Sequence, residues 1–240
     1  MSQPVCIVWF RQDLRVIDNP ALLAAVEHGT VVPVYIFDTE LDEADQPGGA
    51  SNWWLHHSLV SLNKRLNGHL QCFTGEPKKI LNELVDKFSA QAIFWNRCYE
   101  PAVIDRDKEI KQTLRECDCL VSSFNGSLLW EPMSIRKQDG GIYRVFTPYY
   151  RKGCLQASAP RYPSSAPERI TYADVANEGH SIDDAGLLPE INWDSDFAKH
   201  WKPGEAGAAD KLSEFIQHAA KGYQDQRNIP SVRGTSRLSP

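Results

Sequence analysis

The sequence has no excess of basic residues, no membrane-spanning run and no secretory leader. Its 240 residues include 26 Lys or Arg and 31 Asp or Glu, which gives a net charge of −5 at pH 7. A domain that binds nucleic acid through its overall charge is usually basic, so bulk electrostatics argue against that role. No apolar run approaches the length of a transmembrane helix, and no basic segment followed by an apolar one opens the chain. We therefore expect a cytoplasmic protein that does not contact a membrane.

The sequence also lacks a pattern of cysteines or histidines that would bind a metal. Its six cysteines are scattered, and the closest pair, Cys117 and Cys119, has no common zinc spacing. His56 and His57 have no cysteine or acidic residue at ligand spacing, so both are expected to be partly exposed helix residues. We predict no disulfide and no metal site.

No glycine-rich phosphate-binding motif follows any predicted strand. The sequence contains neither Gly-x-Gly-x-x-Gly nor Gly-x-x-x-x-Gly-Lys-Ser/Thr. Dinucleotide binding of the usual kind and P-loop phosphate transfer therefore lose support. The chain also contains no internal repeat and no low-complexity block.

Apolar strand-like segments alternate with helical segments from residue 5 to about residue 124. Continuous apolar strands are typical of a parallel sheet covered on both faces, and the crossovers between such strands are right-handed. We therefore predict a doubly wound, Rossmann-like α/β fold with a five-stranded parallel sheet in the order 3-2-1-4-5. The predicted strands are residues 5–10, 31–37, 69–73, 91–96 and 119–124, and the predicted helices are residues 20–28, 51–67, 77–88 and 102–116.

The predicted helix over residues 51–67 has apolar residues at helical spacing. They are Trp54, Leu55, Leu59, Leu62 and Leu66. For this reason we expect Trp54 to pack against the sheet. Trp53 can either pack there or remain available to a ligand, and the pattern leaves both open.

The first predicted strand leads into a charged loop and then into a helix. Arg11, Asp13 and Arg15 follow the apolar run within five positions, and Asn19 is placed to cap the helix. The predicted strand order puts this loop at the switch point of the sheet, where open α/β folds build binding sites. Structural ion-pair networks gather the same residue types at strand ends. We favour a structural network over a catalytic site.

The strand–helix alternation stops after residue 124. Residues 149–156 are predicted to form a short helix, and residues 205–221 another. The predicted domains are an α/β domain over residues 1–130, an irregular extension and interdomain linker over residues 131–204, and the truncated start of a helical domain over residues 205–240.

Two stretches resemble the DNA photolyase/cryptochrome family. Trp-Phe-Arg-Gln-Asp-Leu-Arg at residues 9–15, followed by Asp-Asn-Pro-Ala-Leu at residues 18–22, resembles the family's amino-terminal signature. Tyr-Gln-Asp-Gln-Arg-Asn-Ile-Pro at residues 223–230, with Gly-Thr-Ser-Arg-Leu-Ser-Pro at residues 234–240, resembles the start of its FAD-binding helical domain.

Two further segments, residues 49–59 and residues 95–101 followed by Arg106-Asp107, are similar to parts of folate-binding photolyases and plant-type cryptochromes. Residues 145–148 also resemble a segment of the family. The resemblance covers nearly the whole chain apart from residues 158–204. It implies the N-terminal, antenna-binding portion of a class I-type deoxyribodipyrimidine photolyase.

The resemblance also implies which residues bind FAD. A tyrosine and a Thr-Ser-x-Leu-Ser segment hold the FAD diphosphate in this family. Hydroxyls, backbone N–H groups at a helix start and an arginine suit that anion, although an ordinary Ser/Thr helix cap would explain the same residues. The matching residues here are Tyr223, Thr235, Ser236, Arg237, Leu238 and Ser239.

Family members often bind a second, light-harvesting chromophore, the antenna. The loops at the strand ends would bring together Phe37, Asp38, Trp53 and Glu100. Aromatic rings stack on a flat pigment, and a carboxylate accepts hydrogen bonds from ring N–H groups. Similarity to the folate-binding group favours methenyltetrahydrofolate over 8-hydroxy-deazaflavin, and an empty site stays open.

Both antenna patterns of the family are incomplete in this sequence. The Asn-Glu that some folate-binding members carry after the Tyr-Glu pair is Ala102-Val103 here. The Arg and Asp typical of deazaflavin-binding members are Ser51 and Cys98.

The resemblance implies a lyase that uses blue light and FAD to split cyclobutane pyrimidine dimers in DNA. In such enzymes an electron from excited reduced FAD passes to a dimer flipped out of the duplex. Damaged DNA would bind to the helical domain beyond residue 240, so we assign no catalytic residue here. We expect a monomer, and we expect the 240-residue chain alone to repair nothing.

Two alternatives stay open. A cryptochrome, a blue-light photoreceptor without repair activity, shares the same N-terminal domain. A nucleotide-binding α/β module of the universal-stress or electron-transfer-flavoprotein type shares the predicted sheet, but it does not account for the sequence after residue 233.

Overall fold

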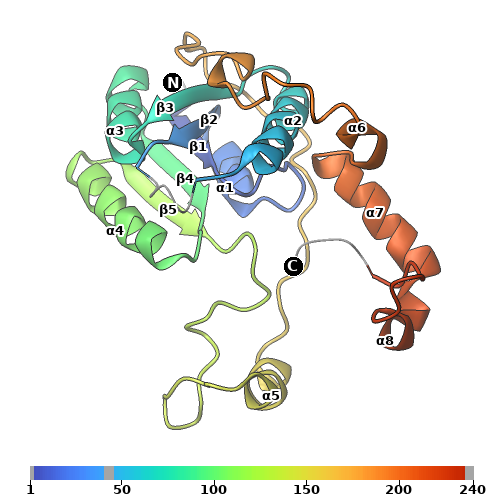
Figure 1. The fold of residues 1–240 in the computed structure, drawn as a ribbon. Coiled ribbons are helices and arrows are strands. Elements are labelled where there is room, and N and C mark those ends of the chain that lie inside the picture. The colour runs from blue at the N-terminus through green and yellow to red at the C-terminus, as the bar shows by residue number, and fades with distance from the viewer. Residues whose placement is uncertain (1–2, 41–45, 236–240) are drawn as a thin grey trace.

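Five parallel strands form the centre of the structure, a computed structural model that describes residues 3–40 and 46–235 (Figure 1). Their order is β3-β2-β1-β4-β5, and every neighbouring pair is parallel. The doubly wound α/β fold and the strand order predicted from the sequence are therefore confirmed. The strands are β1 (Val5–Phe10), β2 (Thr30–Asp38), β3 (Gln71–Gly75), β4 (Ala92–Asn96) and β5 (Leu120–Phe124).

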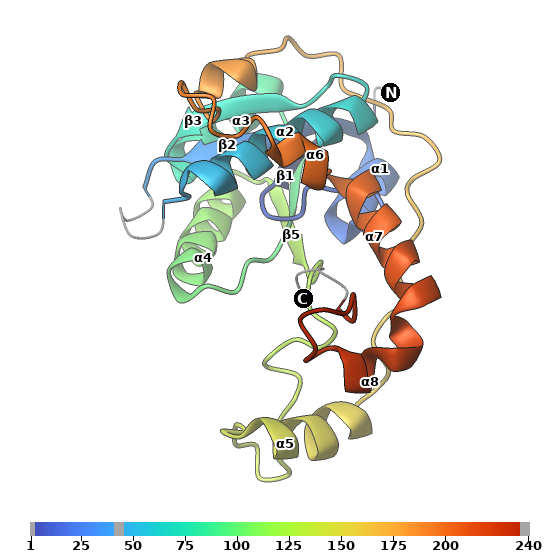
Figure 2. The ribbon, with the colours of Figure 1, turned by 45° about the vertical axis from the view of Figure 1, so that its right-hand side comes forward.

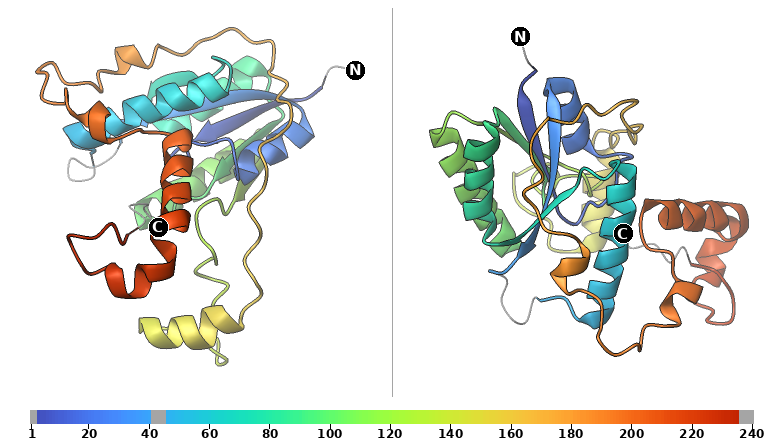
Figure 3. Two further views of the ribbon diagram at one scale, coloured as in Figure 1. Left: turned by 90° about the vertical axis from the view of Figure 1, so that its right-hand side faces the viewer. Right: turned by 90° about the horizontal axis from the view of Figure 1, so that it is seen from above.

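Helices cover both faces of this sheet (Figure 3). One face carries α1 (Pro20–His28) and α2 (Gly49–Arg65), and the other carries α3 (Pro77–Phe88) and α4 (Pro101–Glu116). Three of these helices, α1, α3 and α4, begin with a proline, whose fixed φ and absent N–H suit the first helical position.

Each face of the sheet has its own apolar core, and β1 contributes to both. Ile7 and Trp9 lie in the core beneath α3 and α4, whereas Val8 and Phe10 lie in the core beneath α1 and α2. This alternation follows from the two-residue period of a strand. The continuous apolar run at the start of the chain is therefore a strand buried on both faces, as predicted.

The two tryptophans of α2 differ in burial, and one of them differs from its prediction. Leu59, Leu62 and Leu66 are buried as predicted, but Trp54 is 43% exposed and Trp53 is only 3% exposed. Trp53 is covered by the extension after residue 157, because the ring of Phe197 lies edge-on to it at 5.3 Å. The prediction that Trp54 packs against the sheet is therefore wrong.

The histidines that follow also differ from each other. His57 is partly exposed, as expected, but His56 is 5% exposed. The Nε2 atom of His56 lies 3.6 Å from a carboxylate oxygen of Asp183, which belongs to the same extension. The predicted partial exposure of His56 is therefore wrong, because a segment distant in the sequence lies against this side of α2.

The segment after residue 157 is irregular, as predicted, but it packs against the α/β domain. Tyr172 bridges to Val31 of β2, and His180 bridges to Cys72 of the edge strand β3. The backbones approach so closely that a Cβ on Gly179 would lie 2.6 Å from the Cys72 backbone N and O. This segment therefore covers an open sheet edge that would otherwise present unpaired backbone groups.

The chain then returns along α2. A short helix α6 (Phe197–His200) precedes α7 (Glu205–His218), and α8 (Tyr223–Gln226) follows (Figure 1). Glu205 fixes the start of α7, because its carboxylate accepts a hydrogen bond from the Ile17 N–H at 2.7 Å. The domain boundaries near residues 130 and 204 remain a prediction.

The cysteines give a prediction that tests the packing. All six thiols are free, and burial raises the pKa of Cys6 and Cys119 to about 11 and that of Cys72 to about 12. Cys117 is exposed. We expect one fast-reacting thiol in an alkylation time course at pH 8, and Cys117→Ser should remove it. Fast reaction of Cys72 in the folded protein would contradict the covered sheet edge.

The described residues contain neither a membrane-spanning helix nor a metal-binding cluster. Within residues 3–40 and 46–235, no helix is long and apolar enough to cross a bilayer. The same part of the chain holds no group of three or more His, Cys, Asp or Glu side chains arranged to bind a metal ion.

Candidate functional site

Arg11 begins the loop after β1 and ties it to α4. Its Nη1 donates to both carboxylate oxygens of Asp107 at 3.0 and 2.9 Å, and its Nη2 donates to the backbone oxygen of Asn96. Trp95 donates its indole N–H to the same carboxylate at 3.1 Å. The Arg11 guanidinium also lies 4.6 Å from the centroid of the Trp9 ring. Both charged residues are buried, so this ion pair connects the loop to the core.

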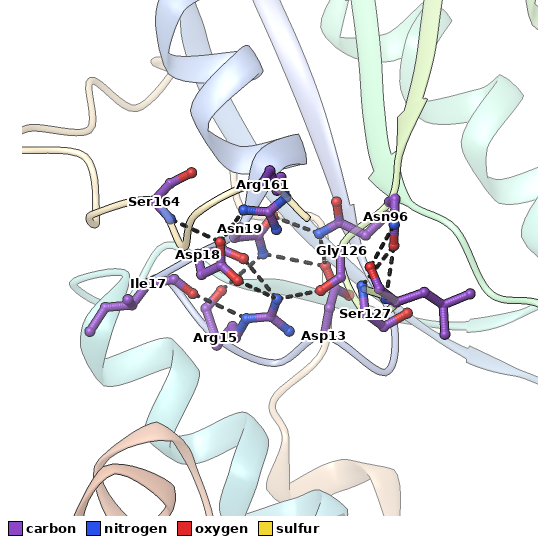
Figure 4. Close-up of polar contacts among 12 residues, drawn as sticks. Asp13, Arg15, Ile17, Asp18, Asn19, Asn96, Gly126, Ser127, Arg161 and Ser164 are labelled. Atoms are coloured by element: carbon purple, nitrogen blue, oxygen red, sulfur yellow. Dashed lines mark hydrogen bonds and ion pairs between the residues drawn. The ribbon is translucent and has the colours of Figure 1, made fainter. Parts of the chain in front are cut away.

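Asp13 binds amides rather than arginines. Its carboxylate accepts hydrogen bonds from the side-chain amides of Asn96 at 2.5 Å and Asn19 at 3.3 Å (Figure 4). It also accepts one from the backbone N–H of Arg11 at 2.9 Å. Asn19 in turn caps α1, as predicted, because its side-chain oxygen accepts from the Leu22 N–H at 3.1 Å. Asp13 therefore joins β1, β4 and α1.

Arg15 closes the loop onto the chain after β5. It donates to the backbone oxygens of Ile17 at 3.1 Å, Asp18 at 2.7 Å and Gly126 at 2.5 Å (Figure 4). Burial alone would raise the pKa of Asp18, but Arg161, the Ser164 N–H and Arg15 together lower it. The three charged residues of the loop thus have structural partners, as predicted, although none forms an ion pair with another.

Each of the four residues predicted to hold an antenna contacts a different partner. Phe37 and Asp38 are consecutive strand residues, so they point to opposite faces of the sheet. Phe37 stacks on His180 at 5.6 Å, while Asp38 pairs with Arg106. Trp53 is buried against the extension.

Glu100, the fourth, is exposed and accepts a hydrogen bond from the Gln12 side chain at 2.9 Å, which lowers the pKa of Glu100. Among the contacts of the described residues, none joins two of the four. Their role in binding an antenna remains a prediction.

A groove between α2, α6 and α7 is lined by exposed aromatic rings. It encloses about 510 Å³, and it is lined by Trp54 and Trp201. Both indoles are nearly half exposed, at 43% and 45%, and their ring centroids lie 5.8 Å apart at 74°. Gly204 and Gly207 line the same groove where α7 begins. The groove thus offers two aromatic rings to a flat ligand.

Basic side chains surround these two rings. Lys199, His200, Lys202 and Lys211 line the groove, and Asp210 is its one acidic lining residue among those described. Lys202 pairs with Asp210 at 2.7 Å. The groove therefore combines stacking surfaces with positive charge, which suits an aromatic ligand carrying carboxylates.

Sequence reasoning did not find this site. Trp54 was assigned to the core, and Trp201 lies in the stretch interpreted as a linker. The available signal was the presence of two tryptophans in otherwise polar surroundings, but nothing in the sequence indicates that positions 54 and 201 meet.

The residues predicted to bind FAD are only partly described. Tyr223 is 40% exposed, lies edge-on to Phe215 at 5.7 Å and has the Arg227 guanidinium 5.5 Å from its ring centroid. Thr235 and Arg233 line a cavity of about 970 Å³ beside α6 and α7. Ser236, Arg237, Leu238 and Ser239 lie outside the described residues.

Comparison with known proteins identifies the family. Residues 6–168 match the family model described as DNA photolyase. The chain belongs to the DNA photolyase family. The resemblance to this family seen in the sequence is thereby confirmed.

Relatives of this photolyase-family chain include both photolyases and cryptochromes. A deoxyribodipyrimidine photo-lyase of Agrobacterium fabrum is 44% identical over 98% of the chain and 49% of its own length. Cryptochrome-2 of Arabidopsis thaliana is 35% identical over 98% of the chain and 40% of its own length. The chain therefore spans about half the length, or less, of these curated relatives.

A solved structure agrees closely with this fold. The crystal structure of a bacterial class III photolyase from Agrobacterium tumefaciens has a TM-score of 0.92 and 42% sequence identity, and it covers 100% of this chain and 50% of that one. The sequence resemblance suggested a class I-type photolyase, whereas this similar structure is that of a class III enzyme.

Proposed function

We propose that the protein is a DNA photolyase that splits cyclobutane pyrimidine dimers under blue light, and that this chain is its antenna-binding part and the start of its FAD site. The observation that carries the proposal is the 44% identity to a deoxyribodipyrimidine photo-lyase along 98% of the chain. The similarity to a class III photolyase structure favours placing the protein in that class.

The described residues near the C-terminal end fit the diphosphate of FAD. Thr235 provides a hydroxyl and Arg233 a guanidinium at one cavity, and Tyr223 adds an aromatic ring on the helix before them. The Arg233 guanidinium lies 3.3 Å from the carboxylate of Glu214, so a phosphate would compete with this carboxylate for it. When bound, FAD supplies the light-driven electron transfer. The chain's own residues would hold its phosphates through hydroxyl and guanidinium donors.

The groove of Trp54 and Trp201 is the better candidate for the antenna. A pteridine ring stacks on indole faces, and Lys199, Lys202 and Lys211 suit the carboxylates of a folate tail. This composition favours methenyltetrahydrofolate, which carries negative charge at its tail, over a pigment held only by ring contacts. The proposal moves the binding site of the pigment to this groove from the predicted strand-end cleft, which is formed by Phe37, Asp38, Trp53 and Glu100.

A repair assay on the full-length protein tests the proposed function. The purified protein is illuminated with blue light in the presence of an oligonucleotide that contains one thymine dimer, and a sample kept in the dark is the control. We expect light-dependent loss of the dimer together with the visible absorption of a bound flavin. Flavin absorption without repair would favour the cryptochrome alternative. The absence of both flavin absorption and repair would refute the proposal.

A further inference from the structure

Residues 131–157 form a lobe that stands apart from the sheet and its helices (Figures 1 and 2). Its base is closed by a hydrogen bond of 3.0 Å from the Trp130 indole N–H to the Ser158 backbone oxygen. Its interior is formed by Ile135 and Cys154, which are 4% and 3% exposed. We call residues 131–157 the basic lobe.

The lobe has a fixed shape rather than that of an open loop. A Cβ on Gly153 would lie 2.5 Å from the Ile135 side chain and 3.2 Å from the Tyr143 ring, so the helical segment that begins with α5 (Phe146–Pro148) packs tightly on the preceding chain. Tyr143 also meets Tyr149 edge-on at 6.1 Å. Groups on the surface of the lobe are therefore held in a defined arrangement.

The charge of the lobe is opposite to that of the chain. The lobe carries five Lys or Arg and two Asp or Glu, a net charge of +3, whereas the whole chain carries −5. One of the two acids, Glu131, is already paired with Arg97 at 2.7 Å. The positive charge is therefore concentrated in a small part of an acidic protein.

Most of these cations have no acidic partner. Lys137, Arg144, Arg151 and Lys152 are exposed, and none forms an ion pair within residues 3–40 and 46–235. Burying four unpaired cations against another protein domain would cost their hydration, and lysine, unlike arginine, is depleted in protein interfaces. Phosphates favour the same groups, since binding releases counterions from the nucleic acid.

An exposed aromatic pair lies among the cations. Phe146 is 74% exposed and Tyr150 43%, and their rings are stacked with centroids 5.8 Å apart at 6°. Aromatic faces interleaved with basic side chains are the usual composition of a surface that binds nucleic acid strands.

From these features we infer that the basic lobe is a DNA-backbone contact, in which Lys137, Arg144, Arg151 and Lys152 hold phosphates while Phe146 and Tyr150 offer a stacking surface. This inference rests on the proposed function for the identity of the nucleic acid. It also revises the expectation that DNA contacts come only from the helical domain. Contacts of this kind bind the phosphates of the DNA backbone and do not recognise the base sequence. The affinity that they provide is therefore the same with and without a lesion.

Two charge-matched variants of the full-length protein test the inference. The lobe variant carries Lys137→Gln, Arg144→Gln, Arg151→Gln and Lys152→Gln. The control carries Lys64→Gln, Lys79→Gln, Lys108→Gln and Lys221→Gln, four exposed residues outside the lobe. Each variant loses the same charge, so any difference between them reports position.

Binding is measured by fluorescence anisotropy with a labelled duplex, with and without a thymine dimer, over a series of salt concentrations. We expect the lobe variant to bind both duplexes about tenfold or more weakly at low salt, and the slope of log K against log salt to become shallower by about 3. The control should stay within about twofold of the wild type.

Equal affinities of the lobe variant and the control for the duplex would overturn the inference. A lobe variant that keeps its DNA affinity but melts at a lower temperature would also overturn it, because its four cations would then act on stability and not on DNA binding. If the lobe variant does not fold, the double variant Arg144→Gln/Arg151→Gln is measured in its place. If the wild type repairs dimers but the lobe variant binds DNA as tightly as the wild type, this inference alone is refuted. Lobe-dependent DNA binding without any repair refutes the proposed function alone.

Discussion

An Asp107→Ala variant should lose about 3–5 kcal/mol of unfolding free energy, because it leaves the Arg11 guanidinium buried without its counter-charge. The side chains of Arg11 and Asp107 are each 7% exposed. The substitution also removes the acceptor of the Trp95 indole N–H, which is fully buried. Urea denaturation followed by tryptophan fluorescence measures the loss, since Trp9 and Trp95 report on this core.

A control on the same helix separates burial from charge. Asp105 pairs with Lys108 at 2.7 Å, but the two side chains are 74% and 70% exposed. Asp105→Ala should therefore cost less than about 1 kcal/mol. Similar losses for the two variants would show that the Arg11–Asp107 pair does not anchor the loop.

A double variant tests whether the cost comes from the orphaned charge. Arg11→Met combined with Asp107→Leu removes both charges and keeps apolar volume. It should recover part of the stability lost in Asp107→Ala, since apolar pairs often replace buried ion pairs at little cost. A double variant less stable than Asp107→Ala would instead assign the stability to the other hydrogen bonds of Arg11, above all the one to Asn96.

The sheet was predictable because its strands are buried on both faces. A strand such as β1, with residues 6–10 buried, has no polar face and reads as a continuous apolar run. The helices α1 and α3 were predicted residue for residue, since each has a proline at its first position and a clear end. Local chemistry specifies these elements, and crossover handedness then leaves few strand orders.

The two tryptophans of α2 were not predictable in the same way. Neighbouring helix positions differ by about 100°, and periodicity alone assigned Trp54 to the face of the leucines. The structure buries Trp53 instead, because Phe197 from a distant segment covers it. The sequence of a helix records how apolar its faces are, but not which distant segment covers each face.

The segment covering the sheet edge illustrates the same limit. Its two bridges to the sheet, at Tyr172 and His180, are single pairs without a run of alternating residues. Composition rich in Pro and Ser correctly indicated irregular structure, but isolated bridges leave no period in a sequence. Contacts between positions 54 and 201 are equally invisible, and for this reason the groove was found only in the structure.

Replacement of the two groove tryptophans should release the antenna. Stacking on one aromatic ring is worth about 1–3 kcal/mol for a nucleobase, and a pteridine has a comparable flat surface. Trp54→Ala and Trp201→Ala should therefore each weaken methenyltetrahydrofolate binding by roughly 5- to 150-fold, and the double variant should purify without it. The near-ultraviolet band of the folate, measured relative to the flavin band of the same sample, gives the result directly.

Two matched variants make this experiment decisive between the groove and the strand-end cleft. Trp193→Ala removes an indole that is equally exposed, at 45%, but packs on Phe197 outside the groove lining. Glu100→Gln keeps the shape of the cleft and removes its carboxylate. If the groove is the site, both variants keep the folate and only Trp54→Ala and Trp201→Ala lose it. Loss of the folate in Glu100→Gln with retention in Trp201→Ala would return the antenna to the strand ends, where the flat pigment would have to displace the contact of His180 on Phe37.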